Sequence, residues 1–261
     1  MIRVALIGDL IGRPGRQALQ ALLPTLVRER QLDLVIANGE NAAGGFGITG
    51  DLTEELLQCG VDVITTGNHV WDRKGIENYF ALQPRLLRPA NYPVEYGRGW
   101  VVVASRRAPA VKIGVINLSG RVFMGVLDCP FRTAVPLIEE IKKETPVVII
   151  DFHAEATSEK QALGWYLDGR VSCLVGTHTH VQTADERLLP GGTAYLSDLG
   201  MTGAMDSVIG MQPEQVIGKF LTAMPRRYEV ATQNVYLHGA VVEIDEQSGR
   251  ALGIERLRLK F

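Results

Sequence analysis

The chain has 261 residues, of which 46% are hydrophobic and 21% charged, and its formal net charge is −2. These values are typical of a globular protein and provide no clustered basic surface for wrapping a nucleic acid. No segment approaches the roughly 20 apolar residues that span a bilayer, and residues 1–8 lack the features of a signal peptide. The scattered cysteines Cys59, Cys129 and Cys173 indicate reduced thiols, so we expect a cytoplasmic protein.

The first part of the chain alternates short apolar runs with helical patterns. The predicted elements are a strand over Arg3–Ile7, a helix over Pro14–Arg30, a strand over Leu32–Ala37, a helix over Thr53–Cys59 and a strand over Val61–Thr65. This order predicts a largely parallel sheet with helices on its faces.

The second part repeats this pattern and ends differently. Strands are predicted over Trp100–Ser105, Val111–Leu118, Val147–Ile150, Val171–Val175 and Thr193–Leu196, and helices over Thr133–Lys143 and Glu155–Asp168. The last stretch, Gln233–Ile244 with Leu252–Phe261, alternates like an antiparallel hairpin. Because no linker or repeat interrupts the chain, we expect a single α/β domain over residues 1–261.

Polar residues that can bind metal ions follow several of these strands directly. The set is Asp9, Glu40, Asn41, Asn68, His69, His153, His178 and His180, which includes four of the five histidines. In open α/β sheets, ligands bind outside the carboxyl ends of the strands. We therefore expect these residues to converge on one site.

The donor types in this set indicate the class of metal ion. Carboxylates, amide oxygens and imidazoles together suit Mn, Fe or Zn better than Ca or Mg. There are too many ligands for one tetrahedral ion, so two ions bridged by a carboxylate are predicted. Such pairs lie about 3.5–4 Å apart, hold a hydroxide between them and favour displacement at phosphorus. Two divalent ions, two carboxylates and one hydroxide leave about one positive charge, which attracts a phosphate.

The order of the motifs resembles a known family. Gly8-Asp9, Gly67-Asn68-His69, His153 and Gly176-Thr177-His178-Thr179-His180 resemble the motif series of the calcineurin-like metallophosphoesterases. Asn38-Gly39-Glu40-Asn41-Ala42, the run from Asp151 to Lys160, and Leu199-Gly200-Met201-Thr202-Gly203 more narrowly resemble the YmdB-like bacterial branch. The resemblance covers nearly the whole chain and implies a four-layer α/β/β/α sandwich of two mixed β-sheets.

The resemblance also implies an assignment of ligands. The first ion would be held by Asp9, Glu40 and His180, and the second by Glu40, Asn68, His153 and His178, with Glu40 bridging. The family's first motif usually reads Asp-x-His, whereas this chain has Ile11 at the third position. Asn41 is the candidate that replaces the missing histidine at the first ion.

By the same resemblance, the chain is a dinuclear metal-dependent phosphodiesterase. It would hydrolyse phosphate esters such as 2′,3′-cyclic nucleotides by attack of a metal-bridging hydroxide, with His69 as the general acid. The implied cofactors are two transition-metal ions per chain, Fe or Mn first and Zn as the alternative. We expect a small phosphodiester or cyclic nucleotide as substrate and no membrane partner, and we leave open an oligomer of identical chains.

Several of these residues have simpler interpretations. Asp9 could cap the helix that begins near Pro14, as aspartates after strands often do. Asp151 and Glu155 are expected to orient histidines instead of binding metal, and His238 in the last hairpin is expected to be structural. Arg13 could contact a substrate phosphate, and the apolar segment Arg121–Met124 could overhang the site.

Three other functions compete with this hypothesis. The glycines after the first strand imitate a dinucleotide-binding fingerprint, but their spacing is wrong and the histidines stay unexplained. A metal-dependent amidohydrolase also uses His-x-His, because activated water attacks carbon as well as phosphorus. A catalytically idle, metal-binding regulatory protein would keep the same residues without turnover.

Overall fold

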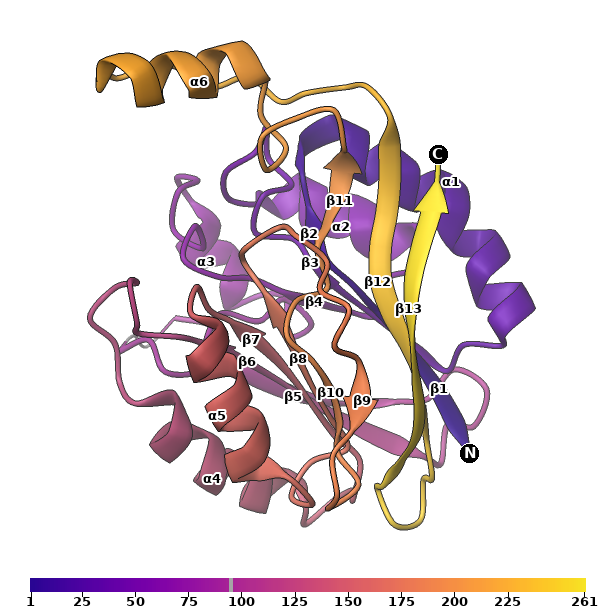
Figure 1. The fold of residues 1–261 in the computed structure, drawn as a ribbon. Helices are drawn as coiled ribbons and strands as arrows, with labels where there is room; N and C mark the ends of the chain where they lie inside the picture. The colour runs from indigo at the N-terminus through magenta and orange to yellow at the C-terminus, as the bar shows by residue number, and fades with distance from the viewer. Residues whose placement is uncertain (94–95) are drawn as a thin grey trace.

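The computed structural model describes residues 1–93 and 96–261 of the chain. Within these residues, two mixed β-sheets pack face to face, and helices cover both outer faces (Figure 1). The fold is thus a four-layer α/β/β/α sandwich, which confirms the architecture that the family resemblance implies.

The first sheet combines a parallel part and an antiparallel part. Its described strands are β1 (Ile2–Ile7), β2 (Asp9–Leu10), β3 (Leu34–Asn38), β4 (Val63–Thr65), β11 (Met201–Ala204), β12 (Val235–Ile244) and β13 (Ala251–Lys260). β1, β3 and β4 run parallel, whereas β12 is antiparallel to β1 and to β13. The carboxyl ends of β1, β3 and β4 therefore lie at the same edge.

The second sheet has a parallel centre with antiparallel edges. Its described strands are β5 (Trp100–Ala104), β6 (Lys112–Ser119), β7 (Val148–His153), β8 (Cys173–Thr177), β9 (Arg187–Leu188) and β10 (Ala194–Leu196). β6, β7, β8 and β10 are parallel, and β5 and β9 pair antiparallel at the two edges. The carboxyl ends of β7 and β8 lie side by side.

Helices occupy the two outer layers. They are α1 (Gly12–Arg30), α2 (Gly50–Gln58), α3 (Ile76–Phe80), α4 (Pro130–Ile141), α5 (Thr157–Leu167) and α6 (Pro213–Thr222). α1 and α2 cover the first sheet, α4 and α5 cover the second, and α6 stands apart at one end (Figure 1). No helix in the described part of the chain combines the length and apolarity that a bilayer crossing requires.

Three apolar layers hold the sandwich together, because side chains along each strand alternate between faces. In β1, Val4 and Leu6 pack between the sheets, and Ala5 and Ile7 pack toward α1 and α2. The second sheet follows the same rule, since β7 sends alternate residues between the sheets and toward α4 and α5. Burial on both faces explains why the strands read as continuous apolar runs.

The strands extend further than their apolar runs predict. The predicted ends at Ala37, Ile150 and Val175 are wrong, because β3 ends at Asn38, and β7 and β8 end at His153 and Thr177. Backbone pairing continues through these polar residues, as in the registers Asn38↔Thr65 and His153↔Thr177. The sheets themselves therefore hold several polar side chains of the predicted site.

Three predicted helix starts are late, the first being that of α1, which begins at Gly12 instead of Pro14. α2 begins at Gly50 instead of Thr53, because the Thr49 side chain accepts a hydrogen bond from the backbone N–H of Leu52 at 3.3 Å and caps the helix. α4 begins at Pro130, a residue suited to the first position of a helix. The sequence pattern also predicts no element between residues 205 and 232, where α6 forms.

Replacing Leu6 with alanine tests the packing between the sheets. Its side chain is 1% exposed, and we expect Leu6→Ala to lower the free energy of unfolding by about 2–5 kcal/mol, because the cavity fills only partly. Urea unfolding measures the change. The control Leu82→Ala removes a side chain that is 78% exposed and should change stability by less than about 0.5 kcal/mol. Equal effects of the two substitutions would contradict this description of the core.

Candidate metal centre

The predicted site residues meet where parallel strands of both sheets end. Asp9 starts β2 directly after β1, Glu40 and Asn41 follow β3, Asn68 and His69 follow β4, His153 ends β7, and His178 and His180 follow β8. Their donor atoms form two groups, Glu40–His153–His178 and Asp9–Glu40–His180, and within each group the atoms lie within 4.8 Å of one another. Glu40 belongs to both groups.

The first group is centred on the His153 ring. Its Nε2 lies 3.1 Å from Glu40 Oε1, 3.0 Å from His178 Nδ1 and 3.0 Å from Asn68 Oδ1. Two donor atoms that each lie about 2.1 Å from one ion are about 3.0–3.4 Å apart, for octahedral to tetrahedral angles. The spacing of these four atoms therefore fits a single transition-metal ion.

Outer hydrogen bonds determine which nitrogens of these two histidines face inward. Thr177 donates its hydroxyl to Asp151 at 2.7 Å, so it accepts from His153 Nδ1, which lies 2.9 Å away. His178 Nε2 lies 3.0 Å from a carboxylate oxygen of Glu155, which can only accept. With both rings neutral, the inner nitrogens would present lone pairs to each other, and a cation or a proton between them would satisfy both. Asp151 and Glu155 therefore hold the histidine rings in place, as the sequence predicts.

The second group has a similar organisation. His180 Nδ1 donates to the carbonyl of Ile209 at 2.8 Å, and its Nε2 lies 3.8 Å from Asp9 Oδ1. Asp9 is 0% exposed, and its Oδ1 has no hydrogen-bond partner among the described residues. A buried carboxylate oxygen without a partner is costly, and a bound cation would remove that cost. Asp9 does not cap α1, whose N-cap is Ile11.

Asn41 lies between the two groups. Its amide nitrogen donates to Glu40 Oε1 at 3.1 Å and lies 3.2 Å from His180 Nε2. An amide nitrogen cannot bind a cation, but rotation of the amide by 180° would place its oxygen at the same point.

Burial and mutual charge separate the pKa values of these groups. Burial raises the pKa of Asp9 to about 6. Burial opposes ionisation of Glu40 as well, but the charge and hydrogen bond of His153 and the smaller contributions of the neighbouring histidines together outweigh it and lower the pKa of Glu40 to about 2. Although burial disfavours its charged form, Glu40 raises the pKa of His153 to about 9, whereas burial and His153 lower the pKa of His178 to about 3. A cation bound here would compete with the proton on His153.

Gly67 allows β4 to approach this cluster. A Cβ atom at this position would lie 2.2 Å from both Glu40 Oε2 and His153 Nε2, so any other residue would displace a donor. The glycine is therefore required by the close approach of the backbone to the donors.

The loop that carries His178 and His180 has a strained backbone. Both residues have positive φ angles, 97° and 66°. Asp198 stabilises the loop because it accepts from the backbone N–H of Thr179 at 3.2 Å and from its hydroxyl at 2.8 Å. Lys160 forms a buried ion pair with Asp198, with 2.7 Å between Nζ and Oδ2.

The supporting residues Asn38, Thr177, Asp198 and Lys160 have no predicted role in the sequence. Asn38 donates to Asp151 Oδ2 at 3.1 Å and to Thr177 Oγ1 at 3.3 Å. Their position in the sequence could have identified three of them, because Asn38, Thr177 and Asp198 are polar residues at or just after strand ends, like the donors.

His69 lies beside the cluster and outside both donor groups. Its backbone N–H donates to Glu40 Oε2 at 3.3 Å, and its Nδ1 lies 2.8 Å from Asp72 Oδ2. The Phe46 ring packs edge-on against the imidazole, with 5.1 Å between ring centroids. This arrangement leaves Nε2 as the nitrogen that can face a ligand.

Two arginines and one loop are further candidates for substrate contacts. Arg16 binds Glu55 and the carbonyl of Ala42, which occupies its guanidinium, and Arg13 is exposed on α1. The backbone N–H of Arg121 donates to Glu159, and Phe123 in the same segment is 90% exposed. A substrate role for Arg13 or for residues 121–124 stays a prediction.

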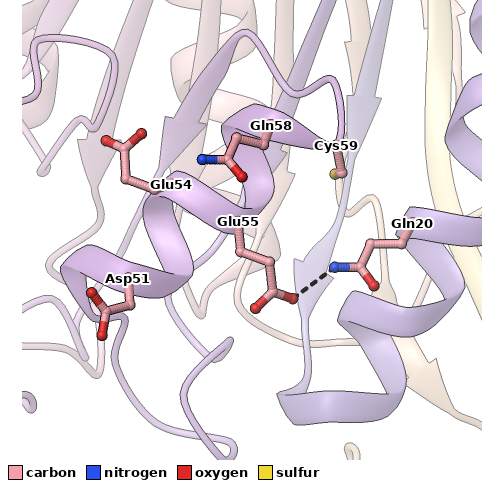
Figure 2. Close-up of a pocket in the computed structure, with 6 residues that line it drawn as sticks. All are labelled: Gln20, Asp51, Glu54, Glu55, Gln58 and Cys59. Carbon is pink, nitrogen blue, oxygen red and sulfur yellow. Dashed lines mark hydrogen bonds between the residues drawn. The ribbon is translucent and has the colours of Figure 1, made fainter.

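A surface hollow between α1 and α2 contains a second group of acidic residues (Figure 2). Its lining residues are Gln20, Asp51, Glu54, Glu55, Gln58 and Cys59. Glu55 accepts from Gln20 at 2.7 Å and Glu54 accepts from Gln83 at 3.0 Å, so protein groups already satisfy these carboxylates. The hollow is acidic and would repel a phosphate.

Known proteins resemble this chain over nearly its whole length. A Bacillus subtilis (strain 168) protein named 2′,3′-cyclic-nucleotide 2′-phosphodiesterase is 49% identical over 257 residues, covering 98% of this chain and 96% of the relative. A Thermus thermophilus structure, titled a hypothetical protein, has 39% identity and a TM-score of 0.92, with 99% of both chains covered. A Mycoplasma pneumoniae structure, titled a novel phosphatase, has 35% identity and a TM-score of 0.92, covering 99% of this chain and 93% of the other.

The sequence family is established by the same agreement. Residues 5–257 match the family described as YmdB-like protein. This match and the 49% identity confirm the resemblance that the motifs indicate, and the structural likeness confirms the fold of the calcineurin-like metallophosphoesterases. The chain therefore belongs to the YmdB-like protein family.

Proposed function

We propose that this protein is a metal-dependent phosphodiesterase with two transition-metal ions per chain. The observation that carries the proposal is that two groups of donors share the single carboxylate of Glu40. A shared carboxylate is the usual bridge between paired ions that act on phosphate esters. The names of the Bacillus and Mycoplasma relatives, a phosphodiesterase and a phosphatase, support the same reaction class.

Each ion would have its own set of ligands. Asp9, Glu40, His180 and Asn41, after rotation of its amide, would hold the first, and Glu40, Asn68, His153 and His178 would hold the second. The mixed oxygen and nitrogen donors favour Fe or Mn, with Zn as the alternative. When bound, the ions would polarise the phosphate and lower the pKa of a water nucleophile.

His69 is proposed to supply the proton for the leaving oxygen. Asp72 would accept a hydrogen bond from Nδ1–H and fix the orientation of the ring, and in the imidazolium form, which carries a proton on each nitrogen, Nε2–H would donate to the leaving oxygen and leave the ring neutral. The hydrogen bond from the His69 backbone to Glu40 holds this residue beside the ions without making it a ligand.

The substrate is proposed to be a small phosphodiester, with 2′,3′-cyclic nucleotides as the first candidate. The support is the name of the Bacillus subtilis relative and its 49% identity to this chain. The cytoplasm is the proposed compartment, since the scattered cysteines indicate reduced thiols.

A hydrolysis panel tests the reaction class. Purified protein is assayed with a 2′,3′-cyclic nucleotide, a 3′,5′-cyclic nucleotide, a phosphate monoester and an amide, each with added Mn, Fe or Zn. We expect the 2′,3′-cyclic nucleotide to be the best substrate and a chelator to abolish turnover. Preferential cleavage of the amide would favour an amidohydrolase, and no turnover with any metal would favour a regulatory protein.

Replacing Glu40 with alanine tests the shared ligand. Because Glu40 belongs to both donor groups, Glu40→Ala should reduce bound transition metal from about two ions to less than one per chain. Elemental analysis of the purified protein measures the ratio. The control Glu55→Ala removes a carboxylate from the surface of α2 (Figure 2) and should retain the full metal content. Full occupancy in Glu40→Ala would show that Glu40 is not the bridge.

Replacing His69 with alanine separates proton transfer from metal binding. His69→Ala should keep its metal and lose about 10²–10⁴-fold in kcat, the range typical of general acid catalysis. Steady-state kinetics and elemental analysis on the same preparation measure both quantities. Lys74→Ala, an exposed change in the same loop, serves as the control. A kcat within about twofold of the wild-type value would remove His69 from the mechanism.

A further inference from the structure

A second cavity lies beside His180 and is not used by the proposed reaction. Its volume is about 300 Å³, which is at the lower end of small-molecule sites. Residues 180–182 line it, and the other lining residues are Met201, Met205, Ser207, Ile209 and, from the β12–β13 hairpin, His238, Arg256 and Arg258. Ile209, which accepts the His180 Nδ1 proton, forms part of the wall, so this cavity and the candidate metal centre share a boundary.

Ile209 itself has an unusual backbone conformation. Its φ is 46°, a left-handed value that branched side chains rarely adopt. Such strain is concentrated at functional positions, where the surrounding structure maintains it. At Ile209 it directs the carbonyl toward His180 and places the residue against the cavity.

A buried histidine without a hydrogen-bond partner within residues 1–93 and 96–261 forms part of the wall of the same cavity. His238 is 3% exposed, and neither ring nitrogen has a hydrogen-bond partner among the described residues. Along β12, His238 lies on the same face of the strand as Ala240 and Val242, which point between the sheets. Buried polar groups are nearly always hydrogen-bonded, so an unpaired imidazole lining a cavity indicates a ligand.

The charge of the cavity indicates what that ligand is. Arg256 and Arg258 line it, and none of its described lining residues is a carboxylate. Arg258 lies opposite His238 in the β12–β13 register and stacks on Tyr236, at 5.1 Å from the ring centroid. Of the described carboxylates, none forms an ion pair with Arg258, whereas Arg256 binds Glu186 at 2.7 Å. A guanidinium group that is paired with no described carboxylate, like that of Arg258, is a preferred partner of phosphate oxygens.

We propose that this cavity is a phosphate subsite, in which Arg258 and His238, with Arg256 beside them, bind a phosphate other than the one that is hydrolysed. The phosphate is either a second phosphate of the substrate, such as the 5′-phosphate of a cyclic nucleotide, or a separate inorganic phosphate. The first source rests on the proposed function, and the second does not. In both cases the bound phosphate lies against Ile209, next to the residue that orients His180.

Two measurements on the metal-loaded protein distinguish these sources. The first is calorimetric titration with inorganic phosphate alone, in which we expect two binding events for the wild type and one for Arg258→Met. The second compares kcat/KM for a 2′,3′-cyclic nucleotide with and without a 5′-phosphate. We expect a wild-type preference of about tenfold for the phosphorylated compound, and its loss in Arg258→Met, because a charge-assisted contact disappears.

Two further variants separate the loss of a phosphate contact from a loss of structure. Lys260→Met removes a positive charge from the same strand outside the cavity and should retain both binding events and the substrate preference. His238→Phe keeps an aromatic ring but removes both nitrogens, and it should weaken the second binding event like Arg258→Met. Circular dichroism establishes that each variant has folded.

Each combination of results decides the proposal. Loss of both identifies one subsite that accepts free phosphate as well as a phosphate of the substrate. Loss of a binding event without a change in preference identifies a separate phosphate, and loss of preference alone identifies a phosphate of the substrate. If Arg258→Met and His238→Phe match the wild type in both measurements, the subsite does not exist. If the wild type hydrolyses neither nucleotide, the proposed function fails, and the titration alone decides whether the phosphate subsite exists.

Discussion

The carboxylate of Glu40 lies where the two donor groups meet, and its burial is the constraint on which this edge of the sandwich depends. Glu40 is 1% exposed and lies 3.1 Å from His153 Nε2, in contact with the backbone of His69 and the amide of Asn41. A buried carboxylate must be paired with positive charge or with hydrogen-bond donors. The partners here are histidine nitrogens that converge on the same point as the carboxylate, so a bound cation would satisfy the carboxylate and the imidazoles together.

The two sheets supply the geometry that such a cluster needs. Side chains at the ends of β1, β3, β4, β7 and β8 meet, and outer hydrogen bonds to Thr177, Glu155 and Ile209 select the nitrogen that each histidine presents. The least regular part, the loop with left-handed His178 and His180, depends on the buried Lys160–Asp198 pair. The proposed phosphate subsite lies on the other side of His180. Binding there and binding at the ions would share one wall.

The convergence of Asp9, Glu40, His153, His178 and His180 could be predicted from the sequence, because each of them lies at or just after the end of an apolar run and such ends meet at one edge of a sheet. The layered fold followed from the family resemblance, since strand periodicity alone indicates only a mostly parallel sheet. The supporting residues were harder to identify, because Asn38 acts across the two sheets through Asp151 and Thr177, and Thr177 acts on Asp151 in the neighbouring strand. α6 could not be predicted, since it stands apart from the sandwich and most of its residues are exposed.

The central claim is that two ions share Glu40, and anomalous X-ray diffraction from metal-loaded crystals tests it most directly. Data collected at the absorption edges of iron and manganese locate each ion and identify its element without any measurement of activity. We predict two anomalous peaks about 3.5–4 Å apart, one beside His180 and Asp9 and the other beside His153 and His178, with Glu40 between them. A single peak, or peaks that do not contact Glu40, would contradict the account.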